Sequence, residues 1–449
     1  MTDITVTDMF CGAGGSTTGA TLAGATVKLA INHWQRAIET HNTNYPQTLH
    51  ALVDLHKENP RRFPRTTALI ASPECTAHTL AKGHKRTEQA QLDLWESIPD
   101  LSQEAEERSR CTMWTPLDWA EYHDYQIVIL ENVVDARLWR PFQSWLQAWK
   151  SLDYEYELCY INSMHAHPTP QSRDRMYFVA WKRGNRRPDL KITPSAYCQK
   201  CEQDIASIQS WKNPTKRYGK YRQQYVYRCP FCTVEVTPWY YAAANAIDWS
   251  LPAQRIGDRK RPLREKTMHR IAYGLSKFRD PLVLNLSHTE SPHASYIITA
   301  QNKPLPTQTT RQDLALAIPP FIMDHLGEYR PRDITGPFST ICAAGNHHSL
   351  VTPAWLMTYY NNGQLVPVEG PVPTVTTLER HALVTSGDTV SVEDCGFRML
   401  APHEIQAAMA FPADYVVTGN HKERVKQLGN AVTPPVMKLL MERCIASLA

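Results

Sequence analysis

Short apolar runs alternate with segments of helical character between residues 4 and 181. The runs predict six strands, at residues 4–10, 27–32, 66–72, 126–132, 156–162 and 175–181. Segments rich in small or apolar residues follow the first two strands and predict helices at 16–25 and 34–42. Strands that alternate with helices are typical of βαβ units. We therefore expect an α/β domain with a mostly parallel sheet.

The pattern changes after residue 181. Residues 182–224 hold eleven Lys and Arg against three acids, and the chain is then rich in Pro, Thr and His up to residue 393. Apolar residues return at helical spacing over 398–411 and again from 425 to the end. We expect a first domain at 1–185, a β- and loop-rich domain at 186–393, and a segment at 394–449 that returns to the first domain.

A weak internal repeat lies in the middle region. Its three copies begin at Pro304, Pro337 and Pro371, so they are spaced by 33 and then 34 residues. A polar stretch and then Leu-Ala or Leu-Val follow each copy. Because a repeat this short cannot bury a face alone, it predicts β-rich units that pack on their neighbours. A solenoid is the alternative interpretation.

The composition is that of an ordinary globular protein. The 449 residues are 42% hydrophobic and 20% charged, and a chain of this length predicts two or three domains. No apolar run approaches the roughly 18 residues of a membrane span. The N-terminus has neither a basic region nor an apolar core of the signal-peptide kind, so we expect a cytoplasmic protein. The formal charge of +4 is too small to indicate a partner.

Four of the eleven cysteines form two CxxC pairs, Cys198 with Cys201 and Cys229 with Cys232. In a reducing compartment this spacing indicates metal binding rather than a disulfide. Four thiolates leave no open coordination position, so the pattern predicts a structural zinc ribbon at about residues 195–235. The residues between the pairs, 216–228, alternate basic with aromatic side chains, which suits contacts with phosphates and bases. The alternative is a solvated face over core tyrosines.

A glycine-rich turn, Asp8 to Gly15, joins the first strand to the first helix. Glycines at such a turn let the backbone approach a ligand closely at the helix N-terminus. The chain has no GxxxxGK[ST] motif, which excludes a phosphate-binding P-loop.

Three further groups stand at the ends of predicted strands. Cys75, in Ser-Pro-Glu-Cys-Thr, follows the third strand, and a thiolate there would be a good nucleophile. Glu131 ends the fourth strand and is a candidate proton donor. Arg173 and Arg175 are two residues apart, which points them the same way, toward an anion or a base edge. Taken singly, Cys75 is better explained as a packed loop residue and Glu131 as a cap or loop acid. A surface ion-pair cluster explains the two arginines equally well.

The order of these motifs is more informative than any one of them. Phe-Cys-Gly-Ala-Gly-Gly, Ser-Pro-x-Cys, Glu-Asn-Val, Gln-x-Arg-x-Arg and a late Gly-Asn-Ala-Val-Thr-Pro-Pro occur in that sequence. The set resembles the DNA cytosine-5 methyltransferase family of phage and prokaryotic restriction–modification systems. It covers residues 1–181 and 394–449, about half of the chain. The resemblance implies a Rossmann-like fold that uses S-adenosylmethionine, with the target recognition domain at 186–393 and the zinc ribbon as an accessory element of it.

The resemblance also implies a mechanism. Cys75 would attack carbon 6 of a cytosine in duplex DNA, and Glu131 would protonate or hydrogen-bond ring nitrogen 3 as charge develops. Arg175, with Arg173 behind it, would hold the base oxygen and the loop that carries Cys75. Carbon 5 would then take the methyl group. Because the target base is not accessible inside a duplex, it would be flipped out.

For the cofactor, the resemblance implies two groups of residues. Phe10 would lie under the adenine, Gly12 and Gly14 would back the methionine part, and the chain at Asn430 and Val432 would close the pocket. Near the adenine and ribose the resemblance points to His33, Trp34 and Asp54. The family's ribose-binding acid is replaced here by Asn-His-Trp at 32–34. Arg398 and Glu404 match the motif that orders the recognition domain.

A second departure concerns the nucleophile. Glu74 stands where the family has proline, and a carboxylate beside the thiol disfavours the thiolate unless a nearby cation compensates. Alternatives therefore stay open: an RNA cytosine-5 methyltransferase, an enzyme for an altered cofactor or base, or a catalytically weak DNA-binding protein on the same frame. We expect a monomer, because one recognition domain and one active site suffice.

Overall fold

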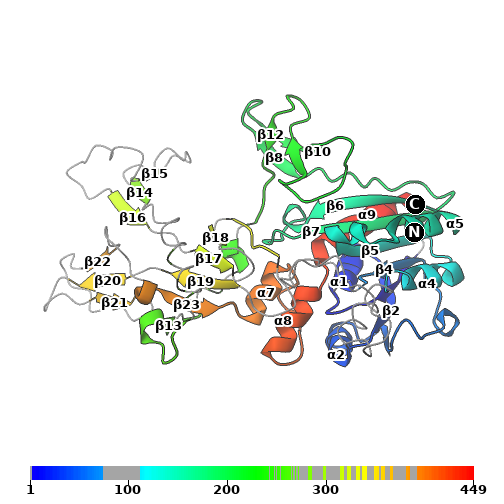
Figure 1. Ribbon diagram of the computed structural model, residues 1–449, viewed down its shortest axis with the longest axis horizontal. Helices are drawn as coiled ribbons and strands as arrows, with labels where there is room; N and C mark the ends of the chain where they lie inside the picture. The colour runs from blue at the N-terminus through cyan, green and yellow to red at the C-terminus, as the bar shows by residue number, and fades with distance from the viewer. Residues whose placement is uncertain are drawn as a thin grey trace, which may run out of the picture. The chain divides into compact units, whose positions relative to one another are not determined.

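The computed structural model describes residues 3–73, 112–241 and 392–449 without interruption, and short segments between 242 and 391 (Figure 1). Cys75, Glu74 and the loop that follows them lie outside the described residues. The chain divides into two compact units. The first comprises Met1–Ala246, Pro337–Gly345 and Pro402–Ala449, and the second comprises Ile247–Gly336 and Asn346–Ala401.

The first unit is built on one seven-stranded sheet with strand order β3-β2-β1-β4-β5-β7-β6 (Figure 1). The strands are β1 (Thr5–Met9), β2 (Thr26–Asn32), β3 (Leu49–Leu52), β4 (Ala68–Ala71), β5 (Ile127–Val133), β6 (Tyr154–Asn162) and β7 (Asp174–Lys182). Neighbouring strands from β3 to β5 are parallel, whereas β7 is antiparallel to both β5 and β6. The expected α/β class with a mostly parallel sheet is confirmed.

Six of the seven strands overlap the predicted apolar runs, but β3 was not predicted. Its four residues are exposed at both ends and half-buried between them. A strand so short and so exposed produces no hydrophobic pattern that sequence reasoning can detect.

Helices cover both faces of the sheet. Side chains alternate between the faces along each strand, so Leu69 enters one core and Ile70 the other. The core of Ile70 contains residues of α1 (Gly15–Leu22) and α9 (Pro434–Leu448). The core of Leu69 contains α4 (Thr115–His123) and α5 (Phe142–Ser151), whose Trp119, Trp145 and Trp149 are fully buried. A sheet covered on both faces explains the continuous apolar strands.

The segment with the CxxC pairs belongs to the first unit. It forms a hairpin of β8 (Ser195–Cys198) and β9 (Gln203–Ala206), followed by a small sheet of β10 (Ile208–Trp211), β11 (Tyr225–Arg228) and β12 (Glu235–Val236). Trp211 packs edge-on against Tyr160 of β6 at 5.8 Å between ring centroids. Gln209 donates a hydrogen bond to the carbonyl of Tyr160 over 2.9 Å. The segment therefore continues the core of the large sheet.

The strands of the second unit follow the sequence repeat. The second unit contains three successive groups of three strands. In each group the first strand lies in the centre and pairs antiparallel with the next two. The triplets are β14, β15 and β16 (Leu282–Asn285, Ile297–Thr299, Leu314–Ala317), then β17, β18 and β19 (Phe321–Asp324, Arg330–Asp333, His348–Thr352), then β20, β21 and β22 (Trp355–Thr358, Leu365–Pro367, His381–Val384). The Leu-Ala and Leu-Val pairs that close the repeats lie in the third strand of each triplet. The expected β-rich character is confirmed.

The C-terminal segment returns to the first unit as α7 (Pro402–Ala408), α8 (His421–Asn430) and α9. The expectation of helix from residue 398 was wrong, because Arg398 lies in strand β23 (Gly396–Met399). The helix begins instead at Pro402, and proline favours the first position of a helix. No helix in the described part of the chain is both long and apolar enough to cross a membrane.

Candidate active site and metal cluster

The glycine-rich turn after β1 has an unusual backbone. Phe10, Gly12 and Gly14 have φ values of 56°, 51° and 83°, all in the left-handed region. The turn is closed by a 2.8 Å hydrogen bond from the amide of Gly14 to the carbonyl of Cys11. A Cβ built on Gly12 would have Phe10 O as its nearest neighbour, at 3.8 Å. Among the described residues, the backbone at Gly12 therefore has space beside it, and its role in cofactor binding stays a prediction.

The next two glycines meet the C-terminal segment. A Cβ on Gly14 would lie 2.4 Å from the hydroxyl of Tyr415, and one on Gly15 would lie 2.0 Å from the carbonyl oxygen of Val432. A larger residue at Gly14 would displace the side chain of Tyr415, and one at Gly15 would displace the backbone at Val432. Val432 is buried and Asn430 is exposed. The structure therefore brings the late Gly-Asn-Ala-Val motif against the glycine turn, although 417 residues of sequence separate Gly15 from Val432.

The other residues proposed for the cofactor follow the carboxyl ends of β2 and β3. His33 is exposed, and Trp34 is half-buried and caps α2 (Gln35–Asn44). The ammonium group of Lys426, from α8, lies 4.6 Å from the centroid of the Trp34 ring. Asp54 is 46% exposed, and its carboxylate lies 3.5 Å from the ammonium group of Lys57. These side chains share one edge of the sheet with Phe10, because β3, β2 and β1 are parallel neighbours.

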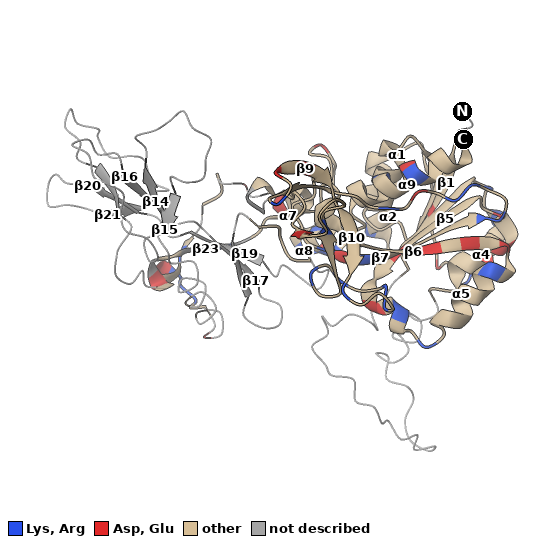
Figure 2. Cartoon of the chain, turned by 90° about the horizontal axis from the view of Figure 1, so that it is seen from above, with Lys and Arg blue, Asp and Glu red and all other residues tan. Residues whose placement is uncertain are grey.

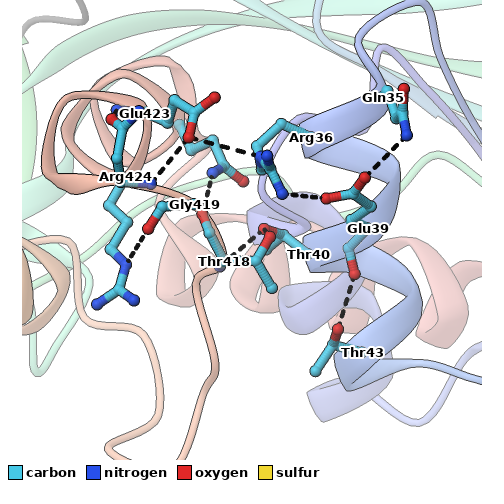
Figure 3. A network of polar contacts seen from close by, with 11 residues as sticks. Gln35, Arg36, Glu39, Thr40, Thr43, Thr418, Gly419, Glu423 and Arg424 are labelled. Carbon is cyan, nitrogen blue, oxygen red and sulfur yellow. Dashed lines mark hydrogen bonds and ion pairs between the residues drawn. The ribbon is translucent and has the colours of Figure 1, made fainter.

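Polar contacts join α2 to the start of α8 (Figure 3). Arg36 Nε lies 3.6 Å from Glu423 Oε2, and the hydroxyls of Thr40 and Thr418 are 2.8 Å apart. Glu423 also completes a capping box with Asn420 at the N-terminus of α8. These contacts fix the helix that ends at Asn430 beside the helix that begins after Trp34.

A series of hydrogen-bonded polar side chains links the first strand and the first helix to the second helix. Thr17 donates to Asp8 Oδ2 over 2.7 Å, His41 Nε2 lies 2.9 Å from Thr17 Oγ1, and His41 Nδ1 lies 2.8 Å from His50 Nε2. Because Thr17 gives its proton to Asp8, His41 donates from Nε2 and accepts from His50 at Nδ1. Burial raises the pKa of Asp8 to about 7 and lowers the pKa of His41 to about 3. The sequence analysis did not find this series of hydrogen bonds, since the four residues share no motif.

The residues predicted to be catalytic lie further along the edge of the sheet, beginning with Glu131 in β5. Its side chain is 9% exposed, and Arg175 Nε of β7 lies 2.8 Å from its Oε1. The neighbouring strands place the two residues there, because Val133 pairs with Arg175 and Glu131 pairs with Tyr177. Burial and the charge of Glu131 raise the pKa of Tyr177, while Arg175 and Arg173 act in the opposite direction. The charges of all three predicted residues therefore act on Tyr177.

Arg173 reaches the C-terminal motif. Its guanidinium donates to the carbonyl of Gly429 over 3.1 Å and to that of Ala431 over 3.2 Å. Its side chain therefore connects β7 to the segment that lies against the glycine turn. Asn162, at the end of β6, accepts from the amide of Arg173 over 3.2 Å. The sequence analysis missed Asn162, which is buried and carries no motif signal.

The chain leads toward Cys75 from β4. The amide of Ser72 donates to the carbonyl of Met9 over 3.2 Å, so the end of β4 lies beside the end of β1. Asn132, next to Glu131, has its Nδ2 at 3.4 Å from the carbonyl oxygen of Pro73. Pro73 is the last described residue before Cys75, which follows two positions later. The chain thus leaves β4 between the glycine turn and Glu131.

The four predicted metal ligands come together. The sulfur atoms of Cys198, Cys201, Cys229 and Cys232 all lie within 4.8 Å of one another. The sulfurs of Cys198 and Cys232 are 3.5 Å apart, and those of Cys201 and Cys229 are 3.8 Å apart. A tetrahedral zinc ion with Zn–S bonds of about 2.3 Å separates its sulfurs by about 3.8 Å. The cluster therefore fits a tetrahedral ion.

A sequence model of C-5 cytosine-specific DNA methylases matches residues 4–230 and 285–446. The chain belongs to this family. Its sheet and helices form the Rossmann-like fold of methyltransferases that use S-adenosylmethionine, as expected. Membership supports cytosine methylation as the activity and S-adenosylmethionine as the expected cofactor. A comparison with curated proteins by sequence finds no match.

Solved structures resemble the chain over nearly its whole length. One is described as a DNA modification methyltransferase encoded within an E. coli prophage, with 13% identity, 99% coverage of both chains and a TM-score of 0.47. Another is DNMT2 of Spodoptera frugiperda, with 13% identity, 99% and 100% coverage and a TM-score of 0.49. Dnmt2 of S. pombe has 11% identity, 99% and 98% coverage and a TM-score of 0.48. The family assignment rests on the sequence match, not on these distant likenesses.

Proposed function

We propose that the protein transfers a methyl group from S-adenosylmethionine to carbon 5 of cytosine at a specific sequence in duplex DNA. The observation that carries the proposal is the buried Glu131–Arg175 pair, 2.8 Å apart. It lies at the edge of the sheet where β4 leads into Cys75. A candidate general acid and a cation are thus held together at the sheet edge from which the chain continues to the predicted nucleophile.

Each residue would have a different role in the reaction. The thiolate of Cys75 forms a bond to carbon 6 of the flipped cytosine, which makes carbon 5 nucleophilic. Glu131 holds a proton at ring nitrogen 3, and Arg175 orients Glu131 and the base oxygen. After carbon 5 has taken the methyl group, loss of its proton and expulsion of Cys75 restore the aromatic ring. Arg173 is proposed to keep the segment at 429–431 in place rather than to touch the base, because it binds two of its carbonyls.

The chain offers a fitting place for the cofactor, which supplies the methyl group when bound. The open backbone at Gly12 would receive its methionine part, Phe10 and Trp34 would flank the adenine, and Asp54 and His33 would approach the adenine and ribose. Val432 would close the cofactor site from the C-terminal side, because its carbonyl oxygen lies against Gly15. We further propose a structural zinc ion at the four cysteines, and a monomer that acts in the cytoplasm of a prokaryotic or phage-infected cell as a modification enzyme.

The test is nucleoside mass spectrometry on duplex DNA incubated with the zinc-loaded protein and S-adenosylmethionine. We expect deoxycytidine to gain one methyl group with the wild type, and none with Cys75→Ser. Glu131→Gln should lower the rate by 10²–10⁴-fold, the range for removing a general acid. The matched control is Glu121→Gln, at an exposed position of α4, which should keep the wild-type rate.

Two further results separate the alternatives. An oligonucleotide with 5-fluorocytosine should trap the wild type covalently through Cys75 and should not trap Cys75→Ser. Methylation of cytidine in RNA without any in duplex DNA would overturn the DNA substrate and keep the chemistry. Binding of duplex DNA with neither methylation nor trapping would overturn the proposed activity.

A further inference from the structure

The loop between β10 and β11, residues 212–224, is the most basic segment in the cysteine-containing part of the first unit. The chain has no acid between Asp204 and Glu235, and within that interval it has six basic residues. Five of them lie in the loop: Lys212, Lys216, Arg217, Lys220 and Arg222. Figure 2 shows basic residues in blue on loops close to β10 and β7.

Three contacts fasten this loop to the active-site strands. The amide of Tyr221 donates to Asp174 Oδ1 over 2.9 Å, and Asp174 directly precedes Arg175. Lys220 Nζ lies 3.4 Å from Asp135 Oδ2, four residues beyond Glu131. The guanidinium carbon of Arg137 lies 3.1 Å from the centroid of the Tyr218 ring. The loop is therefore held at the same edge of the sheet as the Glu131–Arg175 pair.

The loop also has an internally fixed conformation. Gly219 has a φ of 140°, and a Cβ there would lie 2.4 Å from Cβ of Gln224. Gln224 Oε1 accepts from the amide of Lys220 over 2.8 Å, and the ammonium group of Lys212 donates to the carbonyl of Arg222 over 2.7 Å. A loop that is ordered in advance loses less conformational entropy when it binds a ligand.

Two charged side chains in the middle of this loop remain available to bind a ligand. Lys216 and Arg217 are exposed, and neither has an acidic partner within ion-pair distance among the described residues. In contrast, Lys220 forms an ion pair with Asp135, and the guanidinium group of Arg222 lies over the ring of Tyr221. An exposed Lys-Arg pair on a preorganised loop without acids suits a polyanion with closely spaced charges.

We propose that the 212–224 loop binds the phosphodiester backbone of duplex DNA beside the target cytosine, through Lys216 and Arg217. The proposal rests on the proposed function, and it assigns a DNA contact to the cysteine-containing segment of the catalytic unit. Its contacts are to phosphate and so carry no sequence information themselves. They position the duplex at the active site and leave the reading of bases to other parts of the chain.

The test compares the double variant Lys216→Ala/Arg217→Ala with the wild type in fluorescence anisotropy on a labelled duplex, over a series of KCl concentrations. The slope of log K against log salt is negative, and its magnitude should shrink by about 0.9 for each phosphate that the protein no longer neutralises. The double variant should therefore reduce the magnitude by about 1.8. The matched control is Lys28→Ala/Lys191→Ala, which removes the same charge from two exposed lysines outside the loop. The control should keep the wild-type slope.

A slope whose magnitude shrinks equally in both double variants would show a general effect of net charge and would overturn the proposal. If wild-type protein methylates the same duplex, a loop variant that keeps the wild-type slope would also overturn the proposal. The proposed function fails separately, when the wild type neither binds nor methylates duplex DNA at low salt. Equal melting temperatures and metal contents of the variants exclude loss of folding as the cause.

Discussion

At the scale of single residues, burial sets the protonation state of Asp8. It is fully buried, and its hydrogen bonds with Thr17 and Ser16 lower its pKa by less than burial raises it. The result is a pKa of about 7, against an ordinary value of 3.8. The folded state therefore holds a proton on Asp8 over a pH range in which the unfolded chain has lost it.

This difference predicts the direction of a pH effect on stability. Between about pH 4 and pH 7 the folded state binds more protons than the unfolded state, so the free energy of unfolding falls as pH rises. The variant Asp8→Asn has no charge to bury. Its melting temperature relative to the wild type should therefore rise from pH 5 to pH 8, by an amount that corresponds to on the order of a few kcal/mol. Differential scanning calorimetry at both pH values measures it.

Asp204→Asn, at an exposed position, is the control and should shift melting by the same small amount at both pH values. A relative melting temperature of Asp8→Asn that stays constant between pH 5 and pH 8 would contradict the assignment of a raised pKa to Asp8.

At the scale of elements, the approach of α1 to α9 determines where the C-terminal motif lies. A Cβ on Gly19 would lie 2.5 Å from the carbonyl oxygen of Pro434 and 2.6 Å from Cβ of Met437. Glycines at 15 and 19 are one helical turn apart, so they form a smooth face on which the start of α9 rests. The same face holds Val432 against the glycine turn.

Gly19→Ala should therefore destabilise the protein, although alanine favours helices over glycine. Overpacking of this kind costs about 1–3 kcal/mol, because backbone atoms of α9 would have to move. Chemical unfolding monitored by circular dichroism measures the loss. The control Thr21→Ala, on the exposed side of α1, should leave the free energy of unfolding within about 0.5 kcal/mol of the wild type. An alanine at 19 that stabilises the protein would show that the two helices are not in close contact.

The sequence was sufficient for the elements with strong patterns and insufficient for those defined by tertiary contacts. The buried strands β4 and β5 appear as continuous apolar runs, and Glu131 was found because it ends such a run. β3 was missed because its outer residues are exposed. The binding of Arg173 to the carbonyls of Gly429 and Ala431 could not be predicted, since backbone acceptors have no sequence signature. The clustering of the cysteines was predicted, because CxxC spacing fixes the geometry of each pair.

At the scale of the whole chain, the division into two compact units differs from the composition shift at residue 182. The basic, cysteine-containing segment is grouped with the large sheet, whereas the three strand triplets form the second unit. Tyr225, Tyr227 and Cys229 share a hydrophobic core with Trp145 and Phe178 of the sheet unit. The role of residues 186–393 in target recognition stays a prediction. The common core implies that the four-cysteine cluster supports more than its own loops.

Loss of the metal should therefore affect both stability and the loop at the active site. Cys229→Ser removes one of four ligands, and the zinc content measured by plasma mass spectrometry should fall from about one ion per chain to nearly zero. Because structural zinc contributes folding free energy directly, the melting temperature should fall by several degrees, and residues 195–241 should become sensitive to protease. Duplex binding should weaken as in the Lys216→Ala/Arg217→Ala variant, since the 212–224 loop extends from β11, which ends next to Cys229.

The control is Cys444→Ser, which removes a buried thiol of α9 outside the cluster. This variant tests whether loss of any buried thiol gives the same result, and it should keep its zinc. Zinc retained at the wild-type level in Cys229→Ser, or absent from the wild type, would rule out the cluster as a zinc site.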